Sequence, residues 1–189
     1  MKLANPITFP GITHRLNKRT GRFVSPDTID VTINEIRVTL TVDVACGPGG
    51  YWHAGFDARG GPERGTCFVA SSPASKQCKP HVTRCAAIVA AAKAMRVQLL
   101  ACRGGARRSL MINRSERQAL LAEAVFAVDE FIHEPRCRVC GCATNDCQFC
   151  IDRTGDACSW AEPDLCTACV GLEPAAKPSR RQSKARAAR

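Results

Sequence analysis

Two Cys-x2-Cys pairs bound the stretch from Cys137 to Cys169, and they constrain this chain more than any other feature. The first pair is Cys137 and Cys140, the second is Cys166 and Cys169, and twenty-five residues separate them. This spacing lets two thiolates bind one ion across a tight turn, and two such pairs supply the four sulfurs of a tetrahedral Zn²⁺ site. Metal binding then supplies folding energy to a segment with little core of its own. The sequence therefore predicts a zinc-stapled metal module over residues 135–170.

Four more cysteines lie between the two pairs, so the grouping of the sulfurs stays open. The outer set consists of Cys137, Cys140, Cys166 and Cys169. The inner set consists of Cys142, Cys147, Cys150 and Cys158. The outer set predicts one Zn²⁺ ion; the inner set either binds a second or holds thiols that bind nothing, since cysteine is often buried without a ligand role. The Cys-x4-Cys-x2-Cys spacing over 142–150 also matches three ligands of plant-type [2Fe–2S] proteins, which makes an iron–sulfur cluster the alternative cofactor.

The cysteine count and the apolar runs predict a reducing compartment. The chain has thirteen cysteines, an odd number that disulfides within one chain cannot pair completely. No apolar run follows Met1, so we expect no secretory signal. The longest apolar run, from Cys85 to Ala92, has eight residues, far short of the roughly twenty that cross a bilayer. We therefore expect a cytoplasmic protein with no membrane partner, whose clustered thiols bind metal.

The excess positive charge lies at the two ends of the chain. The net charge is +10; residues 1–28 hold five basic residues against one acidic, and residues 171–189 hold six against one. The metal module is acidic, so we expect it to repel phosphate. The chain has few aromatic residues, which favours contact with a nucleic-acid backbone over base stacking. The candidate nucleic-acid-binding residues, in the linker and the tail, are Arg103, Arg107, Arg108, Arg114, Lys177, Arg180, Arg181, Lys184 and Arg186.

Hydrophobic periodicity predicts an α+β fold. Strict alternation over 36–44, shorter alternating runs at 29–33 and 52–57, and an apolar run at 67–70 predict four short strands in an antiparallel meander with one wet face. An alanine-rich helix near 80–102 should cover the dry face, and a second helix should end before Pro135. The expected organisation is a flexible basic arm (1–28), sheet plus helix (29–102), basic linker and second helix (103–134), metal module (135–170) and disordered basic tail (171–189).

Three motifs in the cysteine segment carry a resemblance. They are CRVCGC at 137–142, CSW at 158–160 and EPDLCTAC at 162–169. Together they resemble a Cys-rich module of small uncharacterised proteins from bacteriophages and other mobile elements, and RFVSPD at 22–27 and YWHAGFD at 51–57 resemble segments of such proteins more weakly. The interior of the module is longer here and includes Cys150, so ligand assignment does not transfer. The resemblance implies a mobile-element origin and metal binding, and no reaction.

No motif predicts catalysis. The four histidines stand in no recognisable nucleophile motif, and the chain has no P-loop, dinucleotide fingerprint or H-E-x-x-H. A four-thiolate zinc site is closed, whereas a catalytic zinc needs an open position. We therefore expect no enzyme. The leading hypothesis is a small zinc-binding accessory protein of a phage or mobile element that associates with nucleic acid through its basic arms. The alternative is an adaptor whose acidic metal module docks on a host or phage protein.

Overall fold

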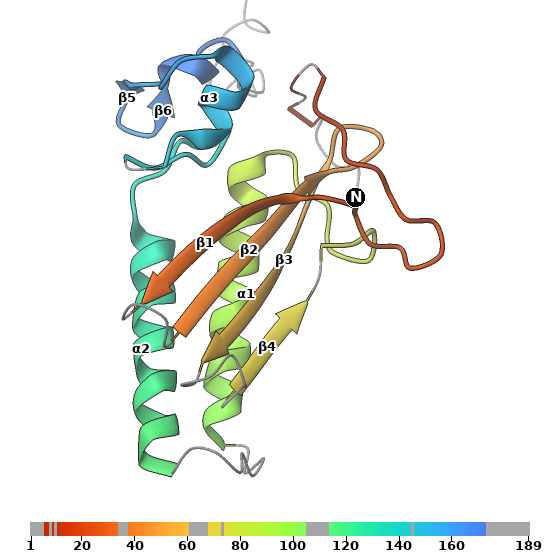
Figure 1. The fold of residues 1–189 in the computed structure, drawn as a ribbon. Helices are drawn as coiled ribbons and strands as arrows, with labels where there is room; N and C mark the ends of the chain where they lie inside the picture. Colours follow the sequence, from red (N-terminus) through yellow and green to blue (C-terminus); the bar gives the residue numbers. More distant parts are fainter. Residues whose placement is uncertain are drawn as a thin grey trace, which may run out of the picture.

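The computed structural model describes residues 6–7, 9, 11–33, 38–60, 68–72, 74–104, 114–144 and 146–172. Its elements are, in chain order, β1 (Asp27–Ile33), β2 (Val38–Cys46), β3 (Trp52–Gly60), β4 (Phe68–Ser72), α1 (Arg84–Gly104), α2 (Arg114–His133), α3 (Gln148–Thr154), β5 (Trp160–Glu162), β6 (Leu165–Cys166) and the 3-10 turn η2 (Thr167–Cys169). This confirms the predicted α+β class, with a cysteine-rich region at the end of the described chain (Figure 1).

The four long strands form one antiparallel sheet in sequence order, β1-β2-β3-β4. The alternation in β2 sets its two faces, because successive side chains of a strand point to opposite sides. Val42 and Val44 are buried, whereas Thr39 is exposed. The register places Val42 opposite Phe56 of β3, so apolar side chains from neighbouring strands share the dry face.

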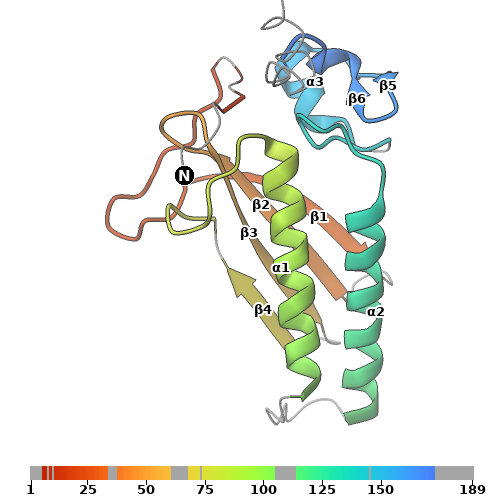
Figure 2. The same ribbon diagram turned by 180° about the vertical axis from the view of Figure 1, so that it is seen from behind.

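Both long helices lie on that dry face (Figures 1 and 2). α1 packs on β2, β3 and β4, and α2 runs beside α1 and reaches β1 and β2. Alanines at 87 and 92 are fully buried, and such small side chains let α1 approach the sheet closely while larger residues fill the space between. The larger buried residues of the two helices are Ile88, Met95, Leu99, Leu120, Leu121, Val125 and Val128. We call the four-stranded sheet with α1 and α2 the body.

Among the described residues, α1 is the one helix long and apolar enough, over Arg84–Cys102, to cross a membrane. The finding rests on length and composition alone, and a core helix of a soluble protein passes the same test. In this structure α1 packs against the sheet and against α2, with Ile88 and Leu99 fully buried. The cytoplasmic location therefore stays a prediction.

The N-terminal segment differs from the flexible arm that its prolines and missing periodicity predict. Ile7 and Phe9 are buried, and the N–H of Ile7 donates to the carbonyl of Val82 (2.8 Å). The Trp52 ring N–H donates to the carbonyl of Ile7 (3.3 Å), and Phe9 packs edge-on against Trp52. Single apolar anchors hold this segment, and such anchors create no repeating pattern in a sequence. Part of the predicted arm therefore belongs to the core.

Candidate metal centre

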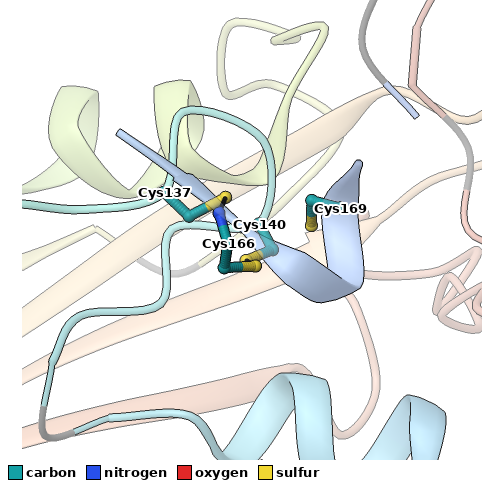
Figure 3. A group of neighbouring side chains, drawn as sticks. All are labelled: Cys137, Cys140, Cys166 and Cys169. Carbon is teal, nitrogen blue, oxygen red and sulfur yellow. Dashed lines mark hydrogen bonds between the residues drawn. The ribbon is translucent and has the colours of Figure 1, made fainter. Parts of the chain in front are cut away.

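Two turns bring the outer cysteine pairs together. In the first turn, the N–H of Gly141 donates to the carbonyl of Cys137 (2.8 Å), and the N–H of Cys137 donates to the carbonyl of Cys142 (2.9 Å). The second turn is β6 followed by η2, which carries Cys166 and Cys169. The N–H of Cys166 points to the sulfur of Cys137 (3.5 Å), so the two turns face each other. Figure 3 shows that the four side chains of the outer set come together.

The structure gathers all eight predicted cysteines into three groups whose sulfurs lie within 4.8 Å of one another. The first group is Cys137, Cys140, Cys166 and Cys169. The second group is Cys140, Cys142, Cys150 and Cys166. The third group is Cys142, Cys147 and Cys158. The clusters could therefore hold metal, as predicted for this segment. The first group is the outer set, but the inner set does not form one group, because Cys150 lies with Cys140 and Cys166.

The helix α3 explains the place of Cys150. Cys147 occupies the N-cap position of α3, and the N–H of Cys150 donates to the carbonyl of Cys147 (2.9 Å). One helical turn separates the two side chains, so Cys150 points into the buried centre while Cys147 stays at its half-buried edge. The three cysteines that match an iron–sulfur spacing are accordingly divided between two groups, with Cys142 in both.

The thiols influence one another strongly. Hydrogen bonds from neighbouring thiols, first of all from Cys140, lower the pKa of Cys137 and of Cys150. The same contacts raise the pKa of Cys140, Cys142 and Cys169, because each of these thiols faces a sulfur that loses its proton first. Without a counter-charge, only part of the cluster can become thiolate. A bound cation removes this limit, since it stabilises every coordinating thiolate.

The metal module is docked on the first turn of α1. The N–H of Cys85 donates to the carbonyl of Val139 (3.2 Å), and Arg84, only 5% exposed, donates to the carbonyl of Cys140 (2.8 Å). The guanidinium of Arg84 also lies 4.1 Å from the centre of the Phe149 ring. Helix α3 and the start of α1 are thus joined through one buried arginine.

An aromatic cluster completes this contact. The ring of Phe149 lies edge-on to Phe9, at 5.2 Å between ring centres, and to Trp52, at 5.9 Å. These residues come from α3, the N-terminal segment and β3. Edge-to-face aromatic pairs contribute about 0.5–1.5 kcal/mol each beyond their buried area. The metal module therefore rests on the body through an apolar contact as well as through Arg84.

A charged chain extends from Arg84 into the sheet. Its Nε lies 3.3 Å from Oδ2 of Asp27, and Oδ1 of Asp27 lies 3.3 Å from Nε2 of His14. The Nδ1 of His14 accepts a hydrogen bond from the N–H of Cys46 (3.0 Å). Burial raises the pKa of Asp27, but the hydrogen bond to His14 and the charge of Arg84 outweigh it, so the pKa lies below its ordinary value. Asp27 therefore stays ionised and keeps Arg84 oriented toward the metal module.

Gly141 lies where the first cysteine turn meets α1, and its replacement gives a direct test of the docking. Its φ is +79°, and an added Cβ would lie 2.6 Å from Cδ1 of Ile88 and 3.1 Å from Cα of Cys85. We expect Gly141→Ala to lower the free energy of unfolding by about 2–4 kcal/mol, because a left-handed backbone and an overpacked contact both cost energy. Gly155→Ala is the matched control: its φ is +84°, nothing lies within 4 Å, and we expect a loss of about 1–2 kcal/mol. Denaturant unfolding measures both variants. Equal losses of unfolding free energy would contradict the close approach of Gly141 to Ile88 and Cys85.

The structure places few of the predicted nucleic-acid-binding residues. Arg114 is exposed at the start of α2, and Arg103 lies in the last turn of α1. The other predicted residues of the linker and the tail lie outside the described residues. They are Arg107, Arg108, Lys177, Arg180, Arg181, Lys184 and Arg186.

A second group of cations appears only in the folded chain. The segments 11–26 and 74–83 are joined by hydrogen bonds, from the N–H of Lys76 to the carbonyl of Gly21 (3.0 Å) and from the N–H of Phe23 to the carbonyl of Ala74 (3.1 Å). The two loops lie side by side beyond the end of the sheet at which β1 begins and β4 ends (Figures 1 and 2). Neither segment contains an acidic residue. Their exposed cations, which we call the basic loop patch, are Arg15, Lys18, Arg19, Arg22, Lys76 and Lys79.

The sequence shows the four cations of the N-terminal loop as part of a basic end of the chain. It does not show that Lys76 and Lys79 lie beside them, because the pairing of the two loops is a tertiary contact. The arginines around the cysteines are a second feature that the sequence analysis above does not predict. Arg84 and Arg136 are both buried, and Arg136 donates to the carbonyl of Gly141 (3.1 Å). A basic residue amid a cysteine cluster is a signal for this role, but Arg84 lies far from that cluster in sequence.

Comparisons of this chain with protein-family models, with curated proteins and with solved structures found no match.

Proposed function

We propose that this protein is a small zinc-binding accessory protein that binds the phosphate backbone of nucleic acid, without reading sequence, through its basic loop patch and basic tail. The observation that carries the proposal is the basic loop patch: six exposed cations on two hydrogen-bonded loops. Among the described residues, no ion pair joins any of the six to an acidic group. Exposed cations without acidic partners are available for phosphate contacts, and such contacts position a protein without specifying bases.

The zinc is proposed to be structural. Six of the eight cysteines are buried, and a site closed by four thiolates leaves no position for a substrate. Two of the cysteines outside the metal module are consistent with this role, since burial raises the pKa of the Cys46 and Cys85 thiols and makes them poor nucleophiles at neutral pH. The mobile-element origin rests on the motif resemblance alone.

The basic loop patch is tested by neutralising one of its lysines. We expect Lys76→Gln to weaken binding to labelled duplex DNA for all sequences alike, and to flatten the slope of log affinity against log salt by about 0.9. The matched control is Lys93→Gln, an exposed lysine on α1 outside the patch, for which we expect little change. Fluorescence anisotropy at several salt concentrations measures both variants.

Deleting residues 171–189 should act in the same direction and by a larger amount, because this segment holds six basic residues. A charge reversal in the metal module, Arg153→Glu, would not be a suitable control for DNA binding. Arg153 donates to the carbonyl of Ala168 and lies 4.0 Å from the sulfur of Cys169, so the substitution would disturb the module itself. If Lys76→Gln and Lys93→Gln weaken binding equally, the patch has no special role. If the full chain does not bind duplex even at low salt, the proposal fails.

The adaptor function is the second candidate, and one observation favours it. The metal module exposes three apolar side chains, Ile151, Trp160 and Val170, on an acidic surface. A rigid, metal-stapled surface with an exposed Trp is suited to a protein partner, because Trp is enriched at interface hot spots. Absence of nucleic-acid binding at low salt would make this function the leading one.

A further inference from the structure

The three cysteine groups share members, and this sharing indicates more than separate metal sites. Cys140 and Cys166 belong to both the first and the second group. Two independent four-thiolate sites would use each sulfur once and would need the inner cysteines to form a group of their own. Three of the inner cysteines do lie together, namely Cys142, Cys147 and Cys158, but the fourth, Cys150, lies with the shared pair, so the described cysteines form no inner group of four.

The distances at the shared pair fit a metal-bound arrangement. With a Zn–S bond of about 2.3 Å, two sulfurs of one tetrahedral Zn²⁺ lie about 3.8 Å apart. The sulfurs of Cys140, Cys150 and Cys166 form a triangle with sides of 3.7, 3.7 and 3.9 Å. That triangle has the size of one face of a zinc–thiolate tetrahedron. Cys140 and Cys166 form one of its edges, and the same edge belongs to the outer set.

Burial also separates the six cysteines of the first two groups from the other two. The six members of the first two groups are at most 3% exposed, whereas Cys147 and Cys158 are only half-buried. The sulfurs of this last pair lie 2.8 Å apart, shorter than a tetrahedral edge. The buried core thus consists of six thiols, with Cys147 and Cys158 at its margin.

Charge favours a shared core over separate sites. Eight thiolates with two Zn²⁺ ions carry about −4, whereas six thiolates with two ions carry about −2, and buried charge is costly unless it is compensated. Three arginines donate to backbone carbonyls of this region: Arg84 to Cys140, Arg136 to Gly141 and Arg153 to Ala168. Arg84 and Arg136 also pair with Asp27 and Glu134, so their charges only partly offset that of the core, which favours the smaller negative charge of six thiolates.

We propose, building on the structural zinc of the proposed function, that the module holds two Zn²⁺ ions in one bridged core in which Cys140 and Cys166 bind both ions. Cys137 and Cys169 are then the terminal ligands of one ion. Cys142 and Cys150 are the terminal ligands of the other. Each ion has four sulfurs, and Cys147 and Cys158 are not required.

The double variant Cys147→Ser/Cys158→Ser separates a bridged core from separate sites. We expect it to retain two zinc ions per chain in native mass spectrometry, because neither residue belongs to the core. Separate outer and inner sites predict one tightly bound ion, because the inner site would lose two of its four ligands. Retention of a single ion, or failure of the variant to fold, overturns the bridged core.

Cadmium substitution tests the same point on the unaltered chain. Two ¹¹³Cd²⁺ ions joined by shared sulfurs should give two NMR resonances linked by scalar coupling, whereas uncoupled resonances would overturn the proposal. Cys140→Ser should perturb both resonances, and Cys147→Ser should leave both in place. A purified protein without zinc, or with the visible absorption of an iron–sulfur cluster, would instead contradict the structural zinc itself.

Discussion

Removing the metal with a chelator is expected to unfold the metal module and to leave the body folded but less stable. Structural Zn²⁺ contributes about 10–16 kcal/mol of apparent binding free energy in small zinc peptides, and the proposed ions would tie together two turns and a helix of seven residues here. Apart from its cysteines, the larger apolar side chains that the module buries are Val139, Phe149 and Leu165. These contacts are too few to hold the segment folded, because ordering each residue costs about 1–2 kcal/mol.

The body has its own core and should survive this loss. The dry face of the sheet is covered by α1 and α2, whose buried residues include Ile88, Leu99 and Leu121. Its melting temperature should nevertheless fall, because Phe149 would leave Phe9 and Trp52 and expose their rings.

NMR of the amide groups with and without chelator, together with calorimetry, measures both effects, and added zinc should restore the module. Cys166→Ser should reproduce the chelated state, whereas Cys102→Ser, at the end of α1, should change little. Loss of all strand and helix signals on chelation would show that module and body fold as one unit. Unchanged spectra would show that metal does not hold the module.

The alternating strands were predictable because their signal is local. Val38, Leu40, Val42 and Val44 recur every second residue, and only a strand with one buried face places them on the same side. Short connections between successive strands then favour an antiparallel meander. The Cys-x2-Cys turns were predictable for the same reason, since four residues suffice to form each of them.

What the sequence could not predict depends on contacts between distant segments. Phe9 is a single aromatic residue among prolines, and only the folded chain brings it against Phe149. The grouping of Cys150 depends on the direction in which α3 enters the module, which no spacing determines. The basic loop patch exists because the N–H of Lys76 binds the carbonyl of Gly21. In each case the decisive contact joins residues far apart in the chain.

Arg84→Met is expected to lower the stability of the zinc-bound protein by about 2–4 kcal/mol. The substitution removes the donor to the carbonyl of Cys140, the ion pair with Asp27 and the contact with the Phe149 ring, while keeping apolar bulk. Breaking a fully buried ion pair costs about 3–5 kcal/mol, and the value is smaller here because the Asp27 side chain is 32% exposed.

The same substitution should also weaken zinc binding. Arg84 donates to the carbonyl of Cys140, a proposed metal ligand, and losing an outer partner of a metal ligand typically lowers metal affinity by about 10–100-fold. Competition with a chromogenic chelator measures this change, and denaturant unfolding at saturating zinc measures the loss of stability. The matched control is Arg96→Met on the same helix, because Arg96 pairs with Asp129 at the surface and contacts no cysteine turn. If both variants bind zinc as tightly as the unaltered chain does, Arg84 does not help to position the cysteines that bind the metal. If Arg84→Met also unfolds like the unaltered chain, the body and the metal module are not joined through this arginine.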